Sequence, residues 1–316
     1  MSTNHNQRPI LIAGPTASGK SGLAVALAER LGGVVINSDS MQVYREVPIL
    51  SAQPTMSEQM GVRHRLYGDV SGAEAYSAAR FAREAGAEIA RAQAEGLRPI
   101  IVGGTGLYFM ALTEGLSPIP EIAVEVRAHW RGEARRLGAG ELYALLMESD
   151  PVAAERLNPA DHQRVTRALE VLHGTGRSLV EWQAVPGVPV VRAEDCSKLV
   201  LVAEREALGE RCDRRFDQML ETGALEEARR FAALGLDAAL PVWGALGLRQ
   251  LVAVEAGEMT LEAAAAASKL VTRQFVKRQQ TWFKRNMITW NVVQMKYLEK
   301  KDADNLSFVD VAMKLL

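Results

Sequence analysis

The sequence predicts an α/β protein in which a parallel sheet forms the core and a helical domain is inserted into it. Short apolar or β-branched runs recur along the chain and alternate with longer helical stretches, a pattern typical of parallel strands joined by helical crossovers. The first of these runs leads directly into a glycine-rich turn and a helical stretch. The middle of the chain loses the short runs and becomes rich in Arg, Glu and Ala, which indicates a helical insertion.

Five segments are predicted to be strands because each is a short apolar or β-branched run. They are Arg8–Ala13, Val34–Asn37, Pro99–Val102, Leu199–Ala203 and Met287–Val293. The stretch Ser21–Leu31 is predicted to be a helix that ends at Gly32. In parallel sheets ligands bind beyond the carboxyl ends of the strands. We therefore expect the turns that follow the first three strands to converge on one site.

Domain boundaries are expected where proline-containing segments flank the change in composition. Ser117–Pro120 precedes the helical patterns and Ala184–Pro189 follows them. We therefore expect residues 1–117 and 197–316 to form the core domain and residues 118–196 to form the insertion. A chain of 316 residues is long enough for both, because domains usually hold about 100–200 residues.

Composition narrows the class of protein. No apolar run approaches the ~20 residues that cross a bilayer, and the N-terminus lacks the apolar region of a signal peptide. Cys196 and Cys212 are too few for a disulfide framework. We expect a cytoplasmic monomer with no membrane partner. The net charge of −1 gives no general support for nucleic-acid binding, so such binding would depend on local basic clusters.

The strongest motif is a phosphate-binding loop between the first strand and the first helix. It matches G-x-x-x-x-G-K-[ST] in the strand–turn–helix context that this motif requires, and it predicts a P-loop NTPase-like core. Its backbone N–H groups would surround a phosphate, Lys20 would add a positive charge, and the Ser21 hydroxyl could hold Mg²⁺. The predicted site for a di- or triphosphate consists of Gly14, Pro15, Thr16, Ala17, Ser18, Gly19, Lys20 and Ser21.

Two further turns at the ends of predicted strands carry polar side chains. Asp39 follows the second strand, where its carboxylate could accept a proton or hold a metal ion near the phosphate. The alternative is that Asp39 or Ser40 caps the next helix. Thr105 follows two glycines after the third strand and offers a hydroxyl group. Its alternative role is that of a helix cap in a tight turn.

Two arginine-bearing segments could contact a polyanion. In the insertion, Arg164 and Arg167 flank the apolar stripe of a predicted helix and could grip successive phosphates or form ion pairs. A later predicted helix, Lys269–Arg285, has a basic face that could follow a nucleic acid or simply be solvated; this face consists of Lys269, Arg273, Lys277 and Lys284. Arg278 falls among Val271, Phe275 and Trp282 in the predicted apolar stripe, so we expect it to have a carboxylate or phosphate partner.

Seven segments resemble, in order and spacing, the tRNA dimethylallyltransferase family. They are GPTASGKS, NSDSMQVYRE, PIIVGGTGLYFMAL, GLSPIP, DPVAAERLNPADHQRVTRALEV, RRFDQML and TRQFVKRQQTWFKR. The cytokinin-forming adenylate isopentenyltransferases fit less well, because the insertion would have little to do on a mononucleotide. The resemblance implies transfer of a dimethylallyl group from dimethylallyl diphosphate to N6 of the adenine just 3′ of the anticodon in tRNA, giving isopentenyladenosine and diphosphate.

The resemblance also implies roles for single residues. The P-loop would hold the diphosphate without ATP hydrolysis, Asp39 would act as the general base, and Thr105 and Arg215 would lie at the diphosphate and the reacting centre. The implied partners are the anticodon stem-loop and dimethylallyl diphosphate, with Mg²⁺ as the cofactor. The implied tRNA contacts are Asp39, Ser40, Met41, Gln42, Thr105, Arg127, Gln163, Arg164, Val165, Thr166 and Arg167.

The sequence departs from the family pattern at two positions and leaves rival functions open. Gln53 stands where the family usually has lysine, and Leu248 stands where it usually has tyrosine. A P-loop nucleotide or small-molecule kinase would also use the loop, Mg²⁺ and arginines, although Asp39, Thr105 and the insertion would then have no assigned role. A non-catalytic RNA-binding module would leave the phosphate loop without a purpose.

Overall fold

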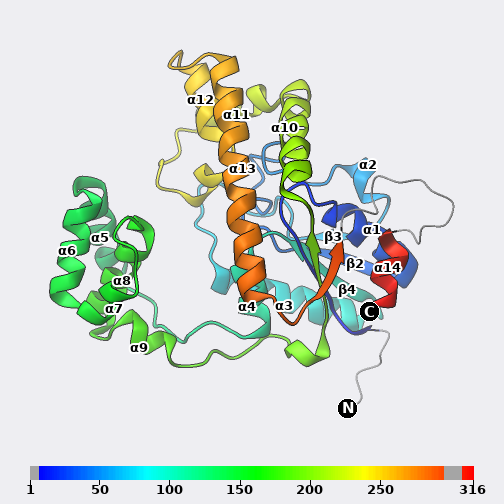
Figure 1. Cartoon of the computed structure of the whole chain (residues 1–316), viewed down its shortest axis with the longest axis horizontal. Helices are drawn as coiled ribbons and strands as arrows, with labels where there is room; N and C mark the ends of the chain where they lie inside the picture. The colour runs from blue at the N-terminus through cyan, green and yellow to red at the C-terminus, as the bar shows by residue number, and fades with distance from the viewer. Residues whose placement is uncertain (1–6, 295–307) are drawn as a thin grey trace. The chain divides into compact units, whose positions relative to one another are not determined.

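The computed structural model describes residues 7–294 and 308–316. The described chain divides into two compact units (Figure 1). The core unit contains the residues up to Thr113 and those from Val190 onward, and the helical unit contains Glu114–Pro189. These boundaries lie a few residues before the expected ones at 117/118 and 196/197.

The core unit is built on a parallel sheet with the strand order β3-β2-β4-β1-β5-β6. Its strands are β1 (Ile10–Ala13), β2 (Gly33–Asn37), β3 (His64–Arg65), β4 (Arg98–Gly103), β5 (Ser197–Val202) and β6 (Asn291–Gln294). Every predicted strand is present with shifted ends. The sequence reading missed β3, because its two polar residues form no apolar run.

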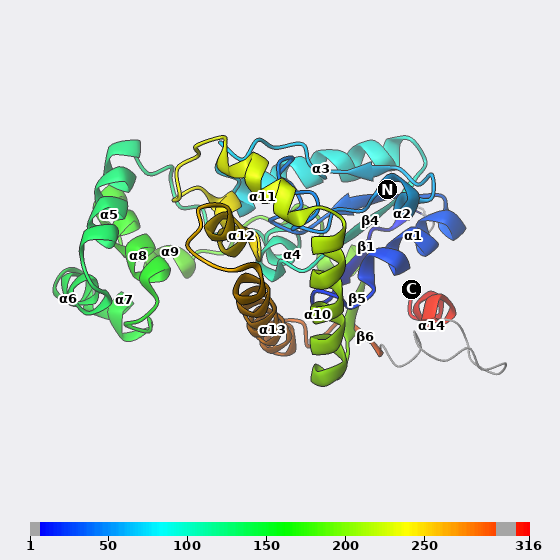
Figure 2. The same cartoon turned by 90° about the horizontal axis from the view of Figure 1, so that it is seen from above.

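Strand β1 lies in the middle of the sheet and is buried on both faces. Its side chains alternate, so Ile10 and Ile12 join one apolar cluster and Leu11 and Ala13 join the other. Leu23 of α1 belongs to the first cluster and Phe81 of α3 to the second, so these two helices cover opposite faces (Figure 2). The polar side chains that follow the central strands can therefore reach solvent only from the turns at the strand ends.

Helices of the core unit pack against the sheet or against one another. They are α1 (Lys20–Leu31), α2 (Met56–Gln59), α3 (Ala78–Ala94), α4 (Gly106–Thr113), α10 (Arg205–Glu221), α11 (Ala224–Ala232), α12 (Leu248–Glu255), α13 (Leu261–Asn286) and α14 (Phe308–Lys314). Helices α10 and α13 pack against each other. Lys269 of α13 forms an ion pair with Asp217 of α10 at 2.6 Å, and Arg273 pairs with Asp213. Part of the predicted basic face is thus neutralised within the protein.

Helix α13 buries a different face from the predicted one. The buried side chains are Ala264, Ser268, Thr272, Val276, Gln279 and Phe283. Polar residues can lie on this face because the Ser268 and Thr272 hydroxyls donate to carbonyls of their own helix, those of Ala264 and Ser268. Arg278 is exposed, and its guanidinium lies 5.8 Å from the Phe275 ring centroid. The expectation that Arg278 sits in a buried stripe was wrong.

The helical unit has its own apolar core. Its helices are α5 (Val124–Arg136), α6 (Ala139–Ser149), α7 (Pro151–Glu155), α8 (His162–Thr175) and α9 (Leu179–Gln183). Trp130, Leu146 and Leu169 pack together at its centre. The two segments that lead into and out of the unit touch at Gly115, where φ is 79° and an added Cβ would lie 2.5 Å from the Val188 nitrogen. Only glycine fits that contact.

Candidate active site

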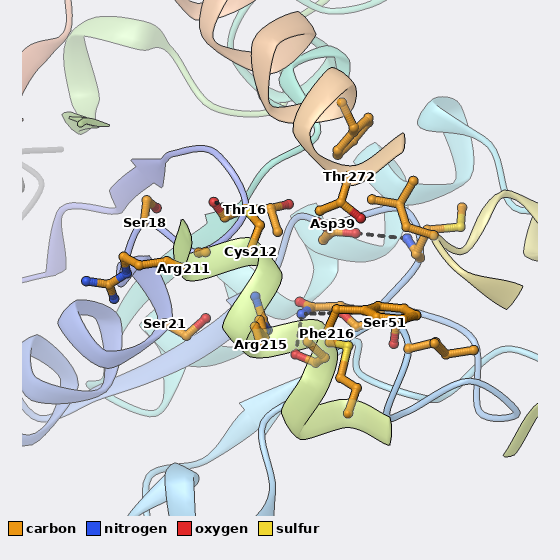
Figure 3. Close-up of a pocket in the computed structure, with 18 of the residues that line it drawn as sticks. Thr16, Ser18, Ser21, Asp39, Ser51, Arg211, Cys212, Arg215, Phe216 and Thr272 are labelled. Atoms are coloured by element: carbon orange, nitrogen blue, oxygen red, sulfur yellow. Dashed lines mark hydrogen bonds between the residues drawn. The ribbon is translucent and has the colours of Figure 1, made fainter. Parts of the chain in front are cut away.

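A pocket of about 700 Å³ opens in the core unit beyond the carboxyl ends of β1 and β2 (Figure 3). Residues 16–22 of the phosphate loop line it together with residues 39–42. The remaining walls include residues 50–52, one face of α10, and Thr272, Phe275 and Arg278 of α13, with Glu58, Gly244 and Leu246 completing the lining. Two of the three turns expected to converge therefore line one pocket, while the third lies directly behind them.

The phosphate loop is shaped by tight contacts among its own residues. Gly19 has a φ of 78° and precedes the first residue of α1, a conformation that favours glycine. An added Cβ on Gly14 would lie 2.7 Å from the Ser18 Oγ, so the loop closes closely around that hydroxyl. The Ser18 Oγ is fully buried and has no hydrogen-bond partner among the described residues. A buried hydroxyl without a partner is costly, so this group is a local cost to the stability of the loop.

Lys20 and Arg215 both lie close enough to the Asp39 carboxylate of this pocket for their pKa values to depend on it. Loss of hydration lowers the pKa of Lys20 to about 8, the nearby Arg215 lowers it further, and Asp39 partly opposes both effects. The Lys20 Nζ donates to the Pro15 carbonyl at 3.3 Å. Burial also lowers the pKa of Arg215, an effect that Cys212, Glu58 and Asp39 partly oppose. A site with this balance of charge favours an anionic ligand, because the ligand would compensate two poorly hydrated cations.

The turn that carries Asp39 is held by the side chain of Asn37. The Asn37 Oδ1 accepts from the Asp39 N–H at 2.8 Å, and its Nδ2 donates to the Asp39 carbonyl at 3.0 Å. The Asp39 Oδ1 accepts from the Met41 N–H at 3.0 Å, an Asx turn. No helix begins between Asp39 and Met56, so the helix-cap alternative for Asp39 and Ser40 was wrong. No described residue donates a hydrogen bond to the Asp39 Oδ2.

Thr105 braces this turn from behind and does not line the pocket. Its Oγ1 accepts from the Ser40 N–H at 3.0 Å and donates to the Ser40 Oγ at 3.3 Å. An added Cβ on Gly103 would lie 2.0 Å from the Ser38 carbonyl oxygen, so glycine is required where the two turns meet. Thr105 therefore acts on the position of Asp39 through Ser40.

Helix α10 presents several basic side chains to the pocket. Arg211, Arg214 and Arg215 line it together with Cys212 and Phe216, and Figure 3 shows Arg215 between Ser21 and Phe216. Sequence reasoning found Arg215 and expected a carboxylate or phosphate partner for Arg278, but it missed Arg211 and Arg214 of α10. Their spacing of three or four residues within α10 was the available signal, but an arginine-rich helix face is usually solvated.

The remaining predicted tRNA contacts lie in the helical unit. Gln163 and Arg164 are exposed and Arg167 is partly exposed on α8, which starts after Asp161 as its N-cap. Val165 is fully buried, and Thr166 is nearly so, with its Oγ1 donating to the His162 carbonyl at 2.7 Å. The side chains of Val165 and Thr166 thus support α8 from inside.

Arg127 lies on α5 and is partly buried. Its Nε is buried and has no hydrogen-bond partner among the described residues. All of these residues belong to the helical unit, whereas every residue that lines the pocket belongs to the core unit.

Comparison with known proteins identifies the family. Residues 42–286 match the family model described as IPP transferase. The chain belongs to this family. It is 51% identical over 303 residues to a protein named tRNA dimethylallyltransferase from Parvibaculum lavamentivorans, covering 96% of each chain. It is 50% identical to the protein of the same name from Azorhizobium caulinodans, covering 89% of this chain and 90% of that protein.

Solved structures of IPP transferase relatives agree with the fold. A eukaryotic dimethylallyltransferase acting on tRNA aligns with a TM-score of 0.79 and 29% identity, covering 94% of this chain and 76% of that chain. The tRNA isopentenylpyrophosphate transferase of Bacillus halodurans aligns with a TM-score of 0.64 and 34% identity, covering 92% and 90%. The expected P-loop NTPase-like α/β fold and the expected family are both confirmed.

Proposed function

We propose that this protein transfers the dimethylallyl group of dimethylallyl diphosphate to N6 of the adenine just 3′ of the anticodon in tRNA. The observation that carries the proposal is that the phosphate loop, Arg215 and Asp39 line one pocket. The N6 nitrogen attacks C1 of the dimethylallyl group, the bond from C1 to oxygen breaks, and its electron pair leaves with the diphosphate. The Asp39 carboxylate takes the proton that N6 loses.

Lys20 and Arg215 stabilise the leaving diphosphate. Negative charge on its oxygen grows as the bond to C1 breaks, so fixed cations stabilise the transition state more than the ground state. Both side chains lose hydration in this pocket, and this burial lowers the pKa of each. Their charges therefore act in a poorly screened environment, and the loop N–H groups add donors to the same oxygens.

The residues of the pocket suit Mg²⁺ bound together with a diphosphate. The described residues hold no cluster of three or more His, Cys, Asp or Glu that could bind a metal alone. Mg²⁺ usually takes one or two protein oxygens and completes its shell with phosphate and water, and the Ser21 hydroxyl is an oxygen of that kind lining this pocket. When bound, Mg²⁺ would neutralise charge on the diphosphate.

The acceptor adenine must leave its stack to reach Asp39. Enzymes that act on bases bind the extruded base in a pocket, and Ser40 and Met41 line this one beside Asp39. The Gln42 side chain donates to the Ser51 and Ala52 carbonyls at 3.0 and 2.7 Å, so we assign it to support of the pocket wall. On the helical unit, the contacts to tRNA come from Arg127, Gln163, Arg164 and Arg167.

The decisive experiment incubates the purified protein with unmodified tRNA, Mg²⁺ and dimethylallyl diphosphate, followed by mass spectrometry of the digested nucleosides. We expect adenosine to gain one dimethylallyl group without any need for ATP. Consumption of ATP with a small acceptor and no prenylated adenosine would instead support the kinase. Binding of tRNA without any product would support the RNA-binding module.

We also expect a cytoplasmic monomer. Analytical sedimentation tests the oligomeric state, and cell fractionation tests the location. No helix in the described residues could span a membrane.

A further inference from the structure

Gln279 on α13 links two turns of the active site from behind the pocket. Its side chain is buried, with 6% of its surface exposed, and it does not line the pocket. The Gln279 Oε1 accepts from the Thr16 N–H at 3.0 Å, and the Nε2 donates to the Gly104 carbonyl at 3.0 Å. One partner requires an acceptor and the other a donor, so the orientation of the amide is fixed by both bonds.

The two bonds join parts of the site that have different tasks. Thr16 belongs to the loop proposed to hold the diphosphate, and Gly104 precedes Thr105, which braces Ser40 beside Asp39. An added Cβ on Gly104 would lie 2.4 Å from the Gln279 Nε2, so the glycine makes room for this amide. Gln279 therefore links the loop proposed to hold the prenyl diphosphate to the turn that carries the proposed base, Asp39.

We propose that Gln279 is a positioning residue that keeps the phosphate loop in register with the Asp39 turn. This inference rests on the proposed function. Transfer requires N6 and C1 to approach within about 3–3.5 Å in line with the leaving oxygen, and a displacement of about 1 Å can cost about 100-fold in rate. The diphosphate sets the position of C1, and the Asp39 turn sets that of N6. Gln279 fixes one relative to the other without touching either substrate.

The first test replaces Gln279 with methionine, which has a similar length and cannot form either bond. The matched control is Gln280→Met, because the adjacent Gln280 also donates one hydrogen bond, to the Ala203 carbonyl at 3.0 Å, but does not join the two turns. We expect Gln279→Met to lower the single-turnover rate by about 10- to 100-fold. Its Kd values for tRNA and for an unreactive prenyl diphosphate analogue should stay within about threefold of wild type.

A purely structural role predicts other results. Gln279→Met would then lower the melting temperature while the folded fraction turned over at the wild-type rate, or both glutamine variants would lose rate equally. Either result would overturn the positioning role. Absence of prenylation by the wild type would instead overturn the proposed function, and this role with it.

The second test reaches the same link from its other end and remains informative if Gln279→Met does not fold. Gly104→Ala should displace the Gln279 amide and lower the single-turnover rate. Combining Gly104→Ala with Gln279→Ala should lower the rate by much less than the product of the two single effects, because both changes break one link. Effects that multiply would show two independent defects and would overturn the proposal.

Discussion

At the scale of single residues, Asp39 is held by one carboxylate oxygen while the other is left for chemistry. The Oδ1 is engaged by the Met41 N–H, and the Oδ2 lies 3.5 Å from the position that a Cβ on Gly104 would take. Asn37 and Ser40 fix the backbone on either side. In its proposed role as the base, Asp39 held in this way would need little reorganisation before it accepted a proton.

Asp39→Ala should lower turnover by about 10²- to 10⁴-fold and leave tRNA affinity nearly unchanged, because a general base typically contributes that much to the rate. Single-turnover kinetics and tRNA binding measured on the same preparation check this. Asp39→Asn is the control for shape, since its Oδ1 can still accept from Met41 while the basic oxygen is lost. Full turnover by either variant would place the base elsewhere.

Lys20 should make the binding of prenyl diphosphate depend on pH. Its pKa is about 8 in the unliganded protein, and a bound diphosphate stabilises the charged form and raises that pKa. Binding therefore takes up a proton above about pH 8, so affinity should be greatest below that pH and fall by at most about tenfold per pH unit above it.

Titration calorimetry with an unreactive prenyl thiodiphosphate between pH 7 and 10 measures the Lys20 effect. Lys20→Arg keeps its charge throughout that range, so its affinity should change little with pH. An equal loss of affinity in Lys20→Arg would assign the dependence to another group, such as Cys212.

At the scale of elements, α8 presents an arginine whose direction is set by a buried carboxylate. Glu170 is buried, and it accepts from the Arg131 Nε at 3.0 Å and from the Arg167 Nη1 at 3.2 Å. The carboxylate anchors both guanidinium groups while leaving much of each exposed. Such anchored arginines lose less freedom when they bind a phosphate than unrestrained ones would.

Arg167→Ala should weaken tRNA binding and reduce the slope of log affinity against log salt by about one. The matched control is Arg177→Ala in the same unit, because Arg177 is 40% exposed and pairs with Glu181, while Arg167 is 42% exposed. Filter binding at several salt concentrations distinguishes the two. Unchanged affinity of Arg167→Ala at low salt would make this residue a surface ion pair only.

Gln53, one of the two departures from the family pattern, lies in the loop between β2 and α2. The Gln53 Nε2 donates to the Tyr44 carbonyl at 2.7 Å, and Glu227 of α11 accepts from the N–H groups of Ile49 and Leu50 at 2.7 and 2.8 Å. The pocket wall at Leu50 is thus held from two sides.

Leu248 is the second departure from the family pattern. It is fully buried at the start of α12, where its apolar side chain needs no hydrogen-bond partner.

At the scale of the whole molecule, the two units have separate apolar cores, and the phosphate site lies in one of them. A ligand that binds only the folded form stabilises it by about 2.7 kcal/mol at 100 times its Kd. Dimethylallyl diphosphate with Mg²⁺ should therefore raise the melting temperature of the core unit and leave the transition of the helical unit unchanged.

Scanning calorimetry with and without the diphosphate measures this shift. ATP with Mg²⁺ at the same concentration is the comparison, and it should produce a much smaller shift than dimethylallyl diphosphate. A larger shift with ATP would contradict the proposed function and favour the kinase.

The sequence by itself determined five of the six described strands and the phosphate loop, because each depends on residues that are close together in the chain, and the order of seven such segments determined the family. The run Ile10–Ala13 and the loop after it can be recognised without knowing what packs on them. Asp39 was found because it follows the second predicted strand, and parallel strands bring their carboxyl ends to one edge of a sheet.

Only the tertiary structure decided which polar groups are buried and what satisfies them. Periodicity shows which residues of a helix share a face but not which face becomes covered, so Arg278 was placed inside and Gln279 was overlooked. Gln279 is bonded to Thr16 and Gly104, and Glu227 to Ile49 and Leu50. These partners lie far apart in the chain, and a buried polar side chain is stable only where folding brings its partners to it.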